Sequence, residues 1–306
     1  QPCRQQSGLS CGFQCREEQQ YRDAQPRSQF TGVMCQIAQP LVEGKVKPCV
    51  QLPLYAAHPR IRVPHRQPGT DAAQPDVILH TAAISDTGYT EQHPEEAYRA
   101  NVELPLWLAR AAAQCGARLV GFSSDQVYAG VQQPGSLPET MELSPANVYG
   151  RQKLEMEQRM LDACPDTVLL RATWMYDLPS YGLPIRGNLP LNLIKATMYG
   201  EKLRFSNCDY RGITYVRQAV ENLVPAANLP GGVYNYGSEN REDMVTTALA
   251  FAEALRLPDV DNLIEAVDWQ RNLAMDCGKL RRYGIRFDTT QEGIYHCLND
   301  YGVADL

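Results

Sequence analysis

The chain has 306 residues, of which 44 % are hydrophobic and 21 % charged, and this size and composition suit one large α/β domain or a domain with a smaller lobe. Its net charge of −6 argues against nucleic-acid binding, and no apolar run reaches the length of a membrane span. The first residues contain no apolar stretch typical of a signal peptide. We therefore expect a cytoplasmic protein that binds neither nucleic acid nor membrane.

Ten cysteines and five histidines are the candidate metal and disulfide residues. None of the cysteines forms a Cys-x-x-Cys pair, and the histidines do not have metal-ligand spacing. The sequence therefore predicts free thiols and no metal site.

The first 66 residues differ from the rest because they are rich in Gln, Arg and Pro and have no helical or strand periodicity. The chain begins with Gln, which indicates a fragment or a processed product. Residues 31–38 are the best candidate for a phosphate-binding loop, with Gly32, Cys35 and Ile37 against a pyrophosphate. Cys35 stands where a glycine is expected, so irregular sequence without a cofactor role, or an altered reading frame, remains an alternative.

From residue 75 onwards, strand-then-helix units repeat, which predicts a doubly wound parallel sheet. Residues 75–83 form the first clear strand, and the small Ala82 and Ala83 at its end either admit a ligand or pack tightly. Residues 84–93 are expected to be a polar loop. Residues 94–115 are expected to be a helix that breaks near Asn101, a residue that usually serves solvent or the local backbone.

The next strand, residues 118–124, ends in a Ser-Ser-Asp sequence. The carboxyl ends of parallel strands form the usual ligand crevice, so Ser124 is a candidate to bind a substrate carbonyl; the alternative is a helix or turn cap. A helix is then expected from Tyr149 to about Ala163, with apolar residues on two of its sides.

Tyr149 and Lys153 begin that helix and have the i, i+4 spacing that places two side chains on one face. A nearby ammonium lowers the pKa of a tyrosine from its ordinary value of about 10 and allows it to exchange a proton with a carbinol oxygen near neutral pH. The pair thus fits the proton half of a carbonyl reduction, for which a nicotinamide would supply the hydride. By chance alone such a pair is common, so its neighbours must support it.

The second half of the chain contains further strands and helices. Trp174, near the end of the strand expected at 168–176, lies in a pocket or in the core. Arg211 or Arg204 can meet a diphosphate or remain a surface residue. Further elements are expected at 192–199 (helix), 214–224 (helix), 232–237 (strand), 244–256 (helix) and 290–301 (helix).

Several of these stretches together resemble the extended short-chain dehydrogenase/reductase superfamily, and more narrowly the dTDP-4-dehydrorhamnose reductase family. The resemblance covers roughly residues 75–300. It rests on the ordered set of residues 75–83, 101–102, 122–128, 145–153, 170–174 and 271–280.

The resemblance implies a role for each matching residue. Tyr149 is then the general acid, Lys153 its pKa partner and a ribose contact, and Ser124 the hydroxyl that orients the carbonyl. The implied cofactor, NADP or NAD, would be bordered by Ala82, Ala83, Asn101, Ser123 and Thr173, and by Gly32, Cys35 and Ile37 of the atypical loop. A nucleotide-sugar substrate would contact Asp125, Trp174 and Arg211. A homodimer is also implied.

We therefore expect an α/β, Rossmann-like fold with a smaller C-terminal substrate-binding lobe. The expected divisions are an irregular segment at 1–27, a dinucleotide-binding domain at 28–176 and the lobe at 177–306, from which some segments return to the main sheet. The predicted function is NAD(P)H-dependent reduction of a 4-keto nucleotide sugar. The alternative is a non-catalytic, nucleotide- or protein-binding regulatory subunit on the same scaffold.

Overall fold

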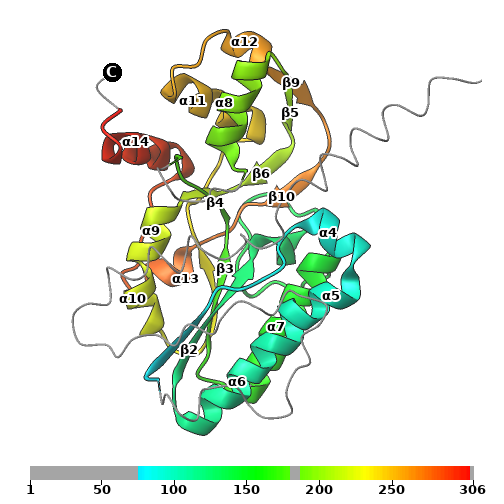
Figure 1. Cartoon of the computed structure of the whole chain (residues 1–306), viewed down its shortest axis with the longest axis vertical. Helices are drawn as coiled ribbons and strands as arrows, with labels where there is room; N and C mark the ends of the chain where they lie inside the picture. The colour runs from blue at the N-terminus through cyan, green and yellow to red at the C-terminus, as the bar shows by residue number, and fades with distance from the viewer. Residues whose placement is uncertain (1–74, 180–186, 304–306) are drawn as a thin grey trace, which may run out of the picture.

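A parallel four-stranded sheet lies at the centre of the computed structural model, which describes residues 75–179 and 187–303. Helices cover both faces of this sheet, as the doubly wound prediction requires (Figure 1). The predicted phosphate loop at residues 31–38 lies outside the described residues. The sheet order is β1 (Val77–His80), β2 (Arg118–Ser124), β3 (Val168–Ala172) and β8 (Gly232–Tyr236).

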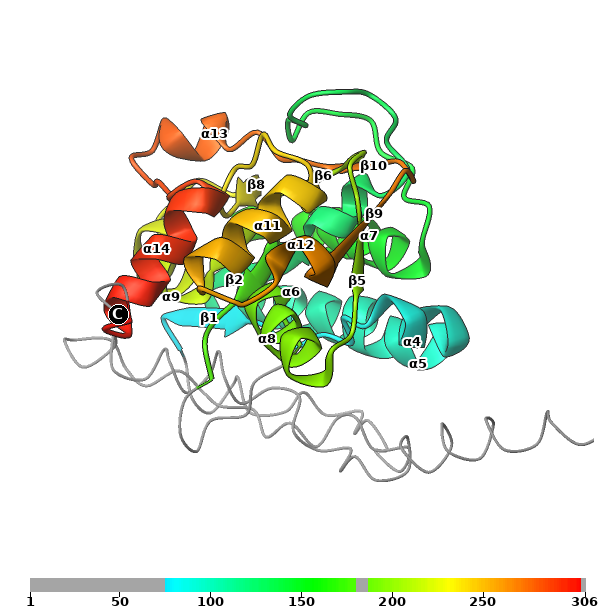
Figure 2. The same cartoon turned by 90° about the horizontal axis from the view of Figure 1, so that it is seen from above.

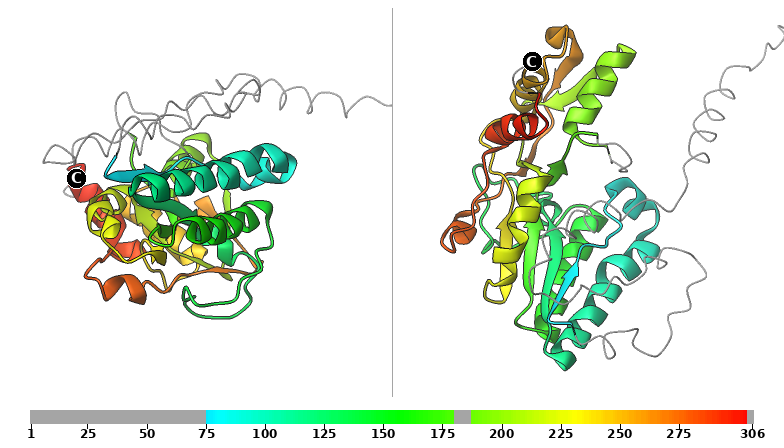
Figure 3. Two further views of the ribbon diagram at one scale, coloured as in Figure 1. Left: turned by 90° about the horizontal axis from the view of Figure 1, so that it is seen from below. Right: turned by 60° about the vertical axis from the view of Figure 1, so that its left-hand side comes forward.

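One face of the sheet packs against α6 (Leu104–Cys115) and α7 (Val148–Ala163), which run side by side (Figure 3). Met156 and Met160 of α7 are fully buried in this contact with the sheet. Leu154 packs instead into a second cluster around Val127. The prediction that this helix has two apolar sides is therefore confirmed.

The opposite face packs against α9 (Val216–Glu221), α10 (Leu223–Ala227) and α13 (Gly278–Arg281). The buried side chains here alternate with those on the α7 face, because successive strand residues point to opposite sides. Phe122 and Leu170 are examples, and both belong to the apolar cluster on this side.

The segment before β2 contains more helix than the sequence indicates. The expected loop at 84–93 contains α4 (Thr87–Gln92), whose first turn is capped by Asp86: its side chain accepts from the backbone N–H of Tyr89. The expected helix at 94–115 is continuous, as α5 (Pro94–Tyr98), the π-helical turn η2 (Arg99–Glu103) and α6. Near Asn101 the helix therefore changes its hydrogen-bond spacing and does not break as expected. Gly116 ends α6 in the left-handed conformation.

The strand expected at 168–176 is interrupted at Thr173. β3 stays in the main sheet, whereas β4 (Trp174–Tyr176) pairs with β7 (Ile213–Tyr215). Only glycine fits beside this change of sheet, because a Cβ at Gly237 would lie 2.6 Å from the Thr173 hydroxyl and 2.5 Å from the Thr214 hydroxyl. The helix expected at 214–224 likewise begins as strand and divides into α9 and α10.

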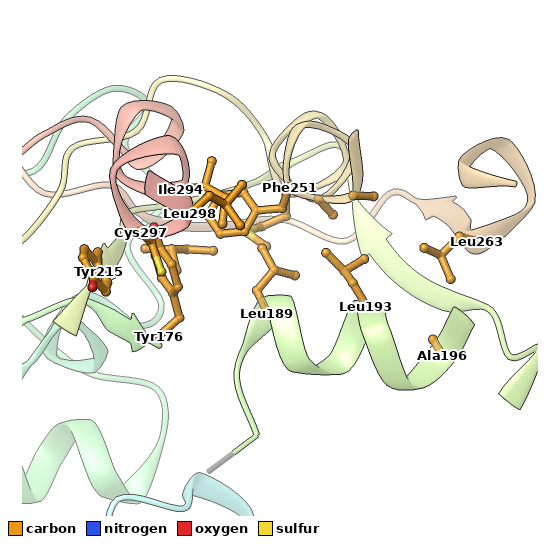
Figure 4. Close-up of a cluster of buried hydrophobic side chains, with 14 residues drawn as sticks. Tyr176, Leu189, Leu193, Ala196, Tyr215, Phe251, Leu263, Ile294, Cys297 and Leu298 are labelled. Atoms are coloured by element: carbon orange, nitrogen blue, oxygen red, sulfur yellow. The ribbon is translucent and has the colours of Figure 1, made fainter. Parts of the chain in front are cut away.

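The remaining elements gather at one end of the molecule around a separate apolar core (Figures 1 and 4). Its central members include Leu193, Phe251 and Ile294, one from each of three helices, and two of these helices, α11 and α14, pack against each other (Figure 2). The predicted division of the chain at residue 177 stays a prediction. The elements at this end are α8 (Leu189–Tyr199), β5 (Leu203–Ser206), β6 (Asp209–Arg211), α11 (Met244–Ala254), α12 (Val260–Leu263), β9 (Ile264–Val267), β10 (Arg271–Leu273) and α14 (Thr290–Asp300).

Candidate active site

The N-terminus of α7 is attached to the end of β2 by a side-chain contact. Asn147 caps α7, accepting from the backbone N–H of Gly150 at 2.7 Å, and its Nδ2 donates to Gln126 Oε1 at 3.0 Å. Gln126 belongs to η3 (Asp125–Tyr128), a 3-10 turn that directly follows β2. The first turn of α7 is thereby held beside the carboxyl end of the sheet.

Tyr149 and Lys153 both lie on the buried side of α7. Their exposed fractions are 6 % and 1 %, and Lys153 Nζ lies 5.8 Å from the centre of the Tyr149 ring. Lys153 Nζ also donates to the backbone carbonyl of Phe122 at 2.8 Å. Burial lowers the pKa of Lys153 from 10.5 to about 8, although the Glu157 carboxylate opposes this shift. Below about pH 8 the site therefore contains an ammonium close to Tyr149.

The buried ammonium predicts a particular dependence of stability on pH. Between about pH 8 and pH 10.5 the unfolded chain binds the Lys153 proton more tightly than the folded chain does. The free energy of unfolding of the wild type, measured relative to Lys153→Met, should therefore rise by about 3 kcal/mol across this range. Urea titrations at several pH values measure it. Lys195→Met, at an exposed position of α8, controls for the loss of a lysine; a pH-independent difference at Lys153 would contradict the prediction.

Ser124 caps the 3-10 turn η3, which was the predicted alternative to a contact with the substrate. Its half-buried hydroxyl accepts from the backbone N–H of Gln126 at 3.2 Å and donates to Asp125 Oδ1 at 3.1 Å. These contacts hold Ser124 at the start of η3. Its role toward a substrate carbonyl stays a prediction.

The three residues expected on the substrate side come together although they are far apart in the sequence. Arg211 Nη2 lies 2.7 Å from Asp125 Oδ2, and the Arg211 guanidinium lies 5.2 Å from the centre of the Trp174 ring. The alternative residue, Arg204, forms an exposed pair with Glu265 instead. Asp125 and Arg211 are largely buried, so of the two arginines only Arg211 belongs to this group.

Several residues predicted to border a cofactor lie at the ends of the strands. Ala82 and Ala83 follow β1 and are partly exposed. The Ser123 hydroxyl, near the end of β2, is buried and has no hydrogen-bond partner in the described part of the chain. The hydroxyl of Thr173, just beyond β3, contacts that of Thr214. Gly32, Cys35 and Ile37 lie outside the described residues.

Asn101 is fully buried and joins three segments. Its Oδ1 accepts from the backbone N–H of Ile84 at 2.9 Å, while its Nδ2 donates to the Ile84 carbonyl at 2.9 Å and to Gln152 Oε1 at 3.0 Å. The partner is therefore distant backbone, not solvent or local backbone as the sequence analysis expected. Asn101 thus fixes the position of the segment around Ile84, which follows β1. A direct contact between Asn101 and the cofactor stays a prediction.

Three buried polar residues near Lys153 were not predicted from the sequence: His80, Glu157 and Arg171. His80 ends β1 with an unpartnered Nε2, and burial together with the charge of Lys153 lowers its pKa to about 3, so it is neutral. Glu157 and Arg171 form a buried ion pair behind Lys153. The available signal was spacing, because Glu157 follows Lys153 by one helical turn.

Two expectations concern what is absent. Among residues 75–179 and 187–303, no group of His, Cys, Asp and Glu is arranged to hold a metal ion. In the same ranges, every helix is too short or too polar to cross a bilayer.

Comparison with known proteins decides the family. A family model described as RmlD substrate binding domain matches residues 67–301, about three quarters of the chain. The chain belongs to this family. The resemblance to dTDP-4-dehydrorhamnose reductases inferred from the sequence motifs is thereby confirmed.

Two kinds of curated relative match the RmlD-family chain. Methionine adenosyltransferase 2 subunit beta of Xenopus laevis is 29 % identical over 236 residues, which cover 69 % of this chain and 66 % of the relative. The dTDP-4-dehydrorhamnose reductase of Mycobacterium tuberculosis is 38 % identical over 104 residues, which cover 33 % of this chain and 34 % of the relative. The chain thus spans just under two thirds of the first relative and about a third of the second.

A solved structure of the same family shares the fold. It is the dTDP-4-dehydrorhamnose reductase of Bacillus anthracis in complex with NADP, with a TM-score of 0.67 and 20 % sequence identity. The match covers 76 % of this chain and 81 % of that structure. The predicted α/β fold with a parallel sheet is therefore confirmed.

Proposed function

We propose that the chain is an NAD(P)H-dependent reductase of a 4-keto nucleotide sugar, with Tyr149 as the general acid. The observation that carries the proposal is the position of Tyr149 and Lys153. Both are buried at the start of α7, and Lys153 donates to the carbonyl of Phe122, two residues before Ser124. The acid and the candidate carbonyl-orienting hydroxyl are thus fixed to one strand end.

The residues at the strand ends fit a dinucleotide. The small Ala82 and Ala83 leave room for close approach. The buried Ser123 hydroxyl has no hydrogen-bond partner among the described residues, and a bound dinucleotide would supply one. The solved structure in complex with NADP supports the same assignment. When bound, the nicotinamide supplies the hydride for the carbonyl carbon.

The chain's own residues handle the proton. The Tyr149 hydroxyl gives its proton to the carbonyl oxygen, and the Lys153 ammonium stabilises the phenolate that remains. Ser124 orients the carbonyl by donating to its oxygen, which requires its hydroxyl to turn away from Asp125. Reduction should therefore fail above about pH 8, where Lys153 loses its charge.

The group formed by Asp125, Trp174 and Arg211 fits the substrate side. Arg211 Nε is buried without a hydrogen-bond partner among the described residues, so the guanidinium keeps donor capacity beyond its pair with Asp125. A diphosphate oxygen would satisfy that donor. The Trp174 ring restricts the guanidinium from one side.

Cofactor affinity provides the first test. In a fluorescence titration we expect micromolar binding of NADPH or NADH. Ser123→Ala should weaken it about fivefold, because a hydrogen bond is worth about 1 kcal/mol. Thr167→Val is the matched control: in the described part of the chain its buried hydroxyl also has no hydrogen-bond partner, but it precedes β3 and so lies at the amino ends of the strands, away from the candidate site. Absence of binding at millimolar cofactor would refute the reductase proposal.

Turnover provides the second test. We expect oxidation of the bound cofactor when dTDP-4-dehydrorhamnose, the substrate named for the related reductases, is added. Cofactor binding without turnover would support the proposed cofactor site but contradict the proposal that dTDP-4-dehydrorhamnose is the substrate. The possible homodimer and the cytoplasmic location also stay predictions.

The second candidate is a regulatory subunit, and the relative with the broader coverage favours it. That relative is by name a subunit of methionine adenosyltransferase 2, and its match covers 69 % of this chain. This candidate predicts a stable complex with a methionine adenosyltransferase catalytic subunit and no reduction of keto sugars. Size-exclusion chromatography of the mixture, with and without NADPH, distinguishes the two functions.

A further inference from the structure

Glu157 and Arg171 form an ion pair that is almost entirely buried. Their exposed fractions are 2 % and 4 %, and Arg171 Nε and Nη2 donate to Glu157 Oε1 and Oε2 at 2.9 and 2.7 Å. Taking two charges out of water costs much of what their attraction returns, and apolar residues at such positions are often at least as stable. Stability alone therefore does not account for the pair.

The pair belongs to a longer chain of hydrogen bonds. Arg171 Nη1 donates to the Tyr128 hydroxyl at 2.8 Å, and that hydroxyl donates to Asn235 Oδ1 at 2.9 Å. Asn235 Nδ2 in turn donates to the backbone carbonyls of Leu137 and Asp276, each at 2.9 Å. These contacts connect α7, β3, η3 and β8 through buried polar groups.

Two members of this hydrogen-bond chain, Glu157 and Tyr128, connect it to the candidate active site. Glu157 lies one turn beyond Lys153 and two turns beyond Tyr149, so the three side chains share one face of α7. Tyr128 is the last residue of η3, the turn that begins at Asp125. The network therefore joins the acid-bearing helix to the substrate-side turn.

We propose that Glu157 and Arg171 are positioning residues, which hold the Tyr149–Lys153 face of α7 in register with η3 and keep an ammonium at Lys153. The catalytic consequence rests on the proposed reductase function, whereas the contacts themselves do not. Neither residue needs to touch the cofactor or the substrate. Both act through Lys153 and Asp125.

The charged groups around Lys153 give Glu157 its electrostatic role. From β1, His80 faces Lys153 but is neutral, since its pKa is lowered to about 3. From β3, Arg171 is neutralised by its pair with Glu157. From β2, the backbone carbonyl of Phe122 accepts from Lys153 Nζ. On α7 itself, the Glu157 carboxylate raises the pKa of Lys153 against the effect of burial.

The test measures the titration of Lys153 directly. The chain has six lysines, so ¹³Cε-labelled lysine gives few NMR signals, and the signal lost in Lys153→Met identifies Lys153. In Glu157→Gln we expect its titration midpoint to fall by about one pH unit, while Glu157→Asp should restore much of the shift. Glu155→Gln is the matched control, since Glu155 belongs to an exposed pair with Arg159 on the same helix; it should leave the midpoint unchanged.

A second variant guards against misfolding of Glu157→Gln, in which Arg171 is left buried and unpaired. The double variant Glu157→Leu with Arg171→Leu removes both charges together. We expect it to fold with a Tm close to that of the wild type, with backbone amides 125–128 exchanging about tenfold faster and with a lowered Lys153 midpoint.

An unchanged Lys153 midpoint in folded Glu157→Gln would overturn the electrostatic part of the proposal. Unchanged exchange at residues 125–128 in the double variant would overturn the positioning part. Both measurements use the chain alone, without cofactor or substrate. A chain that proves not to be a reductase would therefore still give the expected shifts, which keeps the two failures apart. In an active chain, both variants should lower kcat while leaving KM for the cofactor nearly unchanged.

Discussion

Tyr149→Phe should lower kcat by about 10²- to 10⁴-fold, the contribution typical of a positioned general acid. The variant loses one hydroxyl and keeps the buried ring, so the packing of α7 on the sheet should remain. Cofactor affinity should change little. Steady-state oxidation of NADPH with the keto sugar, combined with a cofactor titration of the same preparation, separates loss of chemistry from loss of binding.

Tyr234→Phe is the matched control for this prediction. Tyr234 is as buried as Tyr149, and its hydroxyl donates to the carbonyl of Pro230 on the far side of the sheet. The control should retain full activity with at most a small loss of stability. Activity of Tyr149→Phe within threefold of the wild type would remove Tyr149 from the mechanism, whatever the control shows.

Gly150→Ala is expected to have the second large effect, because no space exists for a side chain. A Cβ on Gly150 would lie 2.2 Å from the backbone carbonyl oxygen of Gln126 and 2.8 Å from Pro145 Cβ. The helix and η3 would have to separate. We expect a loss of about 3 kcal/mol, which lowers Tm by about 10 °C, and a drop in kcat of about 100-fold as Tyr149 moves.

Gly88→Ala provides the same substitution at a site with room. Gly88 lies in the first turn of α4, where a Cβ would meet only Asp86 Oδ1 at 3.4 Å. Since alanine favours the helix, this control should be neutral or slightly more stable than the wild type. The Tm of each variant, measured by thermal unfolding, tests this prediction. A Gly150→Ala protein with the same Tm as Gly88→Ala would show that α7 and η3 are not in fixed contact.

The sequence predicted the parts of the fold that have strong local signals. The strand at 118–124 and the helix from Tyr149 to Ala163 agree with β2 and α7 almost to the residue. Apolar runs bounded by polar residues mark buried parallel strands, and apolar residues that recur with the period of a helix mark a helix. The strand at 232–237 and the helices near 244 and 290 were also correct for the same reasons.

The missed elements depend on tertiary contacts. The interruption at Thr173 accompanies the pairing of β4 with β7, a strand that is distant in the sequence. Asn101 acquires its partners only when Ile84 and Gln152 are brought beside it. In α4, Asp86 caps the first turn, and Glu91 also accepts from the backbone N–H of Val148 at the start of α7, a contact that the polar sequence does not reveal.

In the candidate site, too, the residues with a local sequence signal were predicted, whereas the contacts that depend on tertiary structure were not. Tyr149 and Lys153 were found because one helix fixes their spacing. Asp125, Trp174 and Arg211 were each named separately, but their mutual contact follows from the pairing of β4 with β7 and from the position of β6, which no local pattern encodes. Arg171 gave no signal, because a single arginine within an apolar strand reveals its partner only in the folded chain.

The π-helical turn η2 gives the segment around Asn101 a fixed length. In this turn the N–H of Leu104 bonds to the carbonyl of Arg99, five residues earlier, where an α-helix would use four. Deleting one residue between Asn101 and Leu104 would remove this wider turn, although Pro105 at the start of α6 has no N–H to complete an α-helical hydrogen-bond pattern. It would also rotate everything before the deletion by about 100° relative to α6. Asn101 would then turn away from Gln152 of α7, to whose Oε1 its Nδ2 donates at 3.0 Å. The extra residue of η2 therefore fixes the rotation of this segment about the helix axis, a constraint that surface loops, which tolerate changes of length, do not impose.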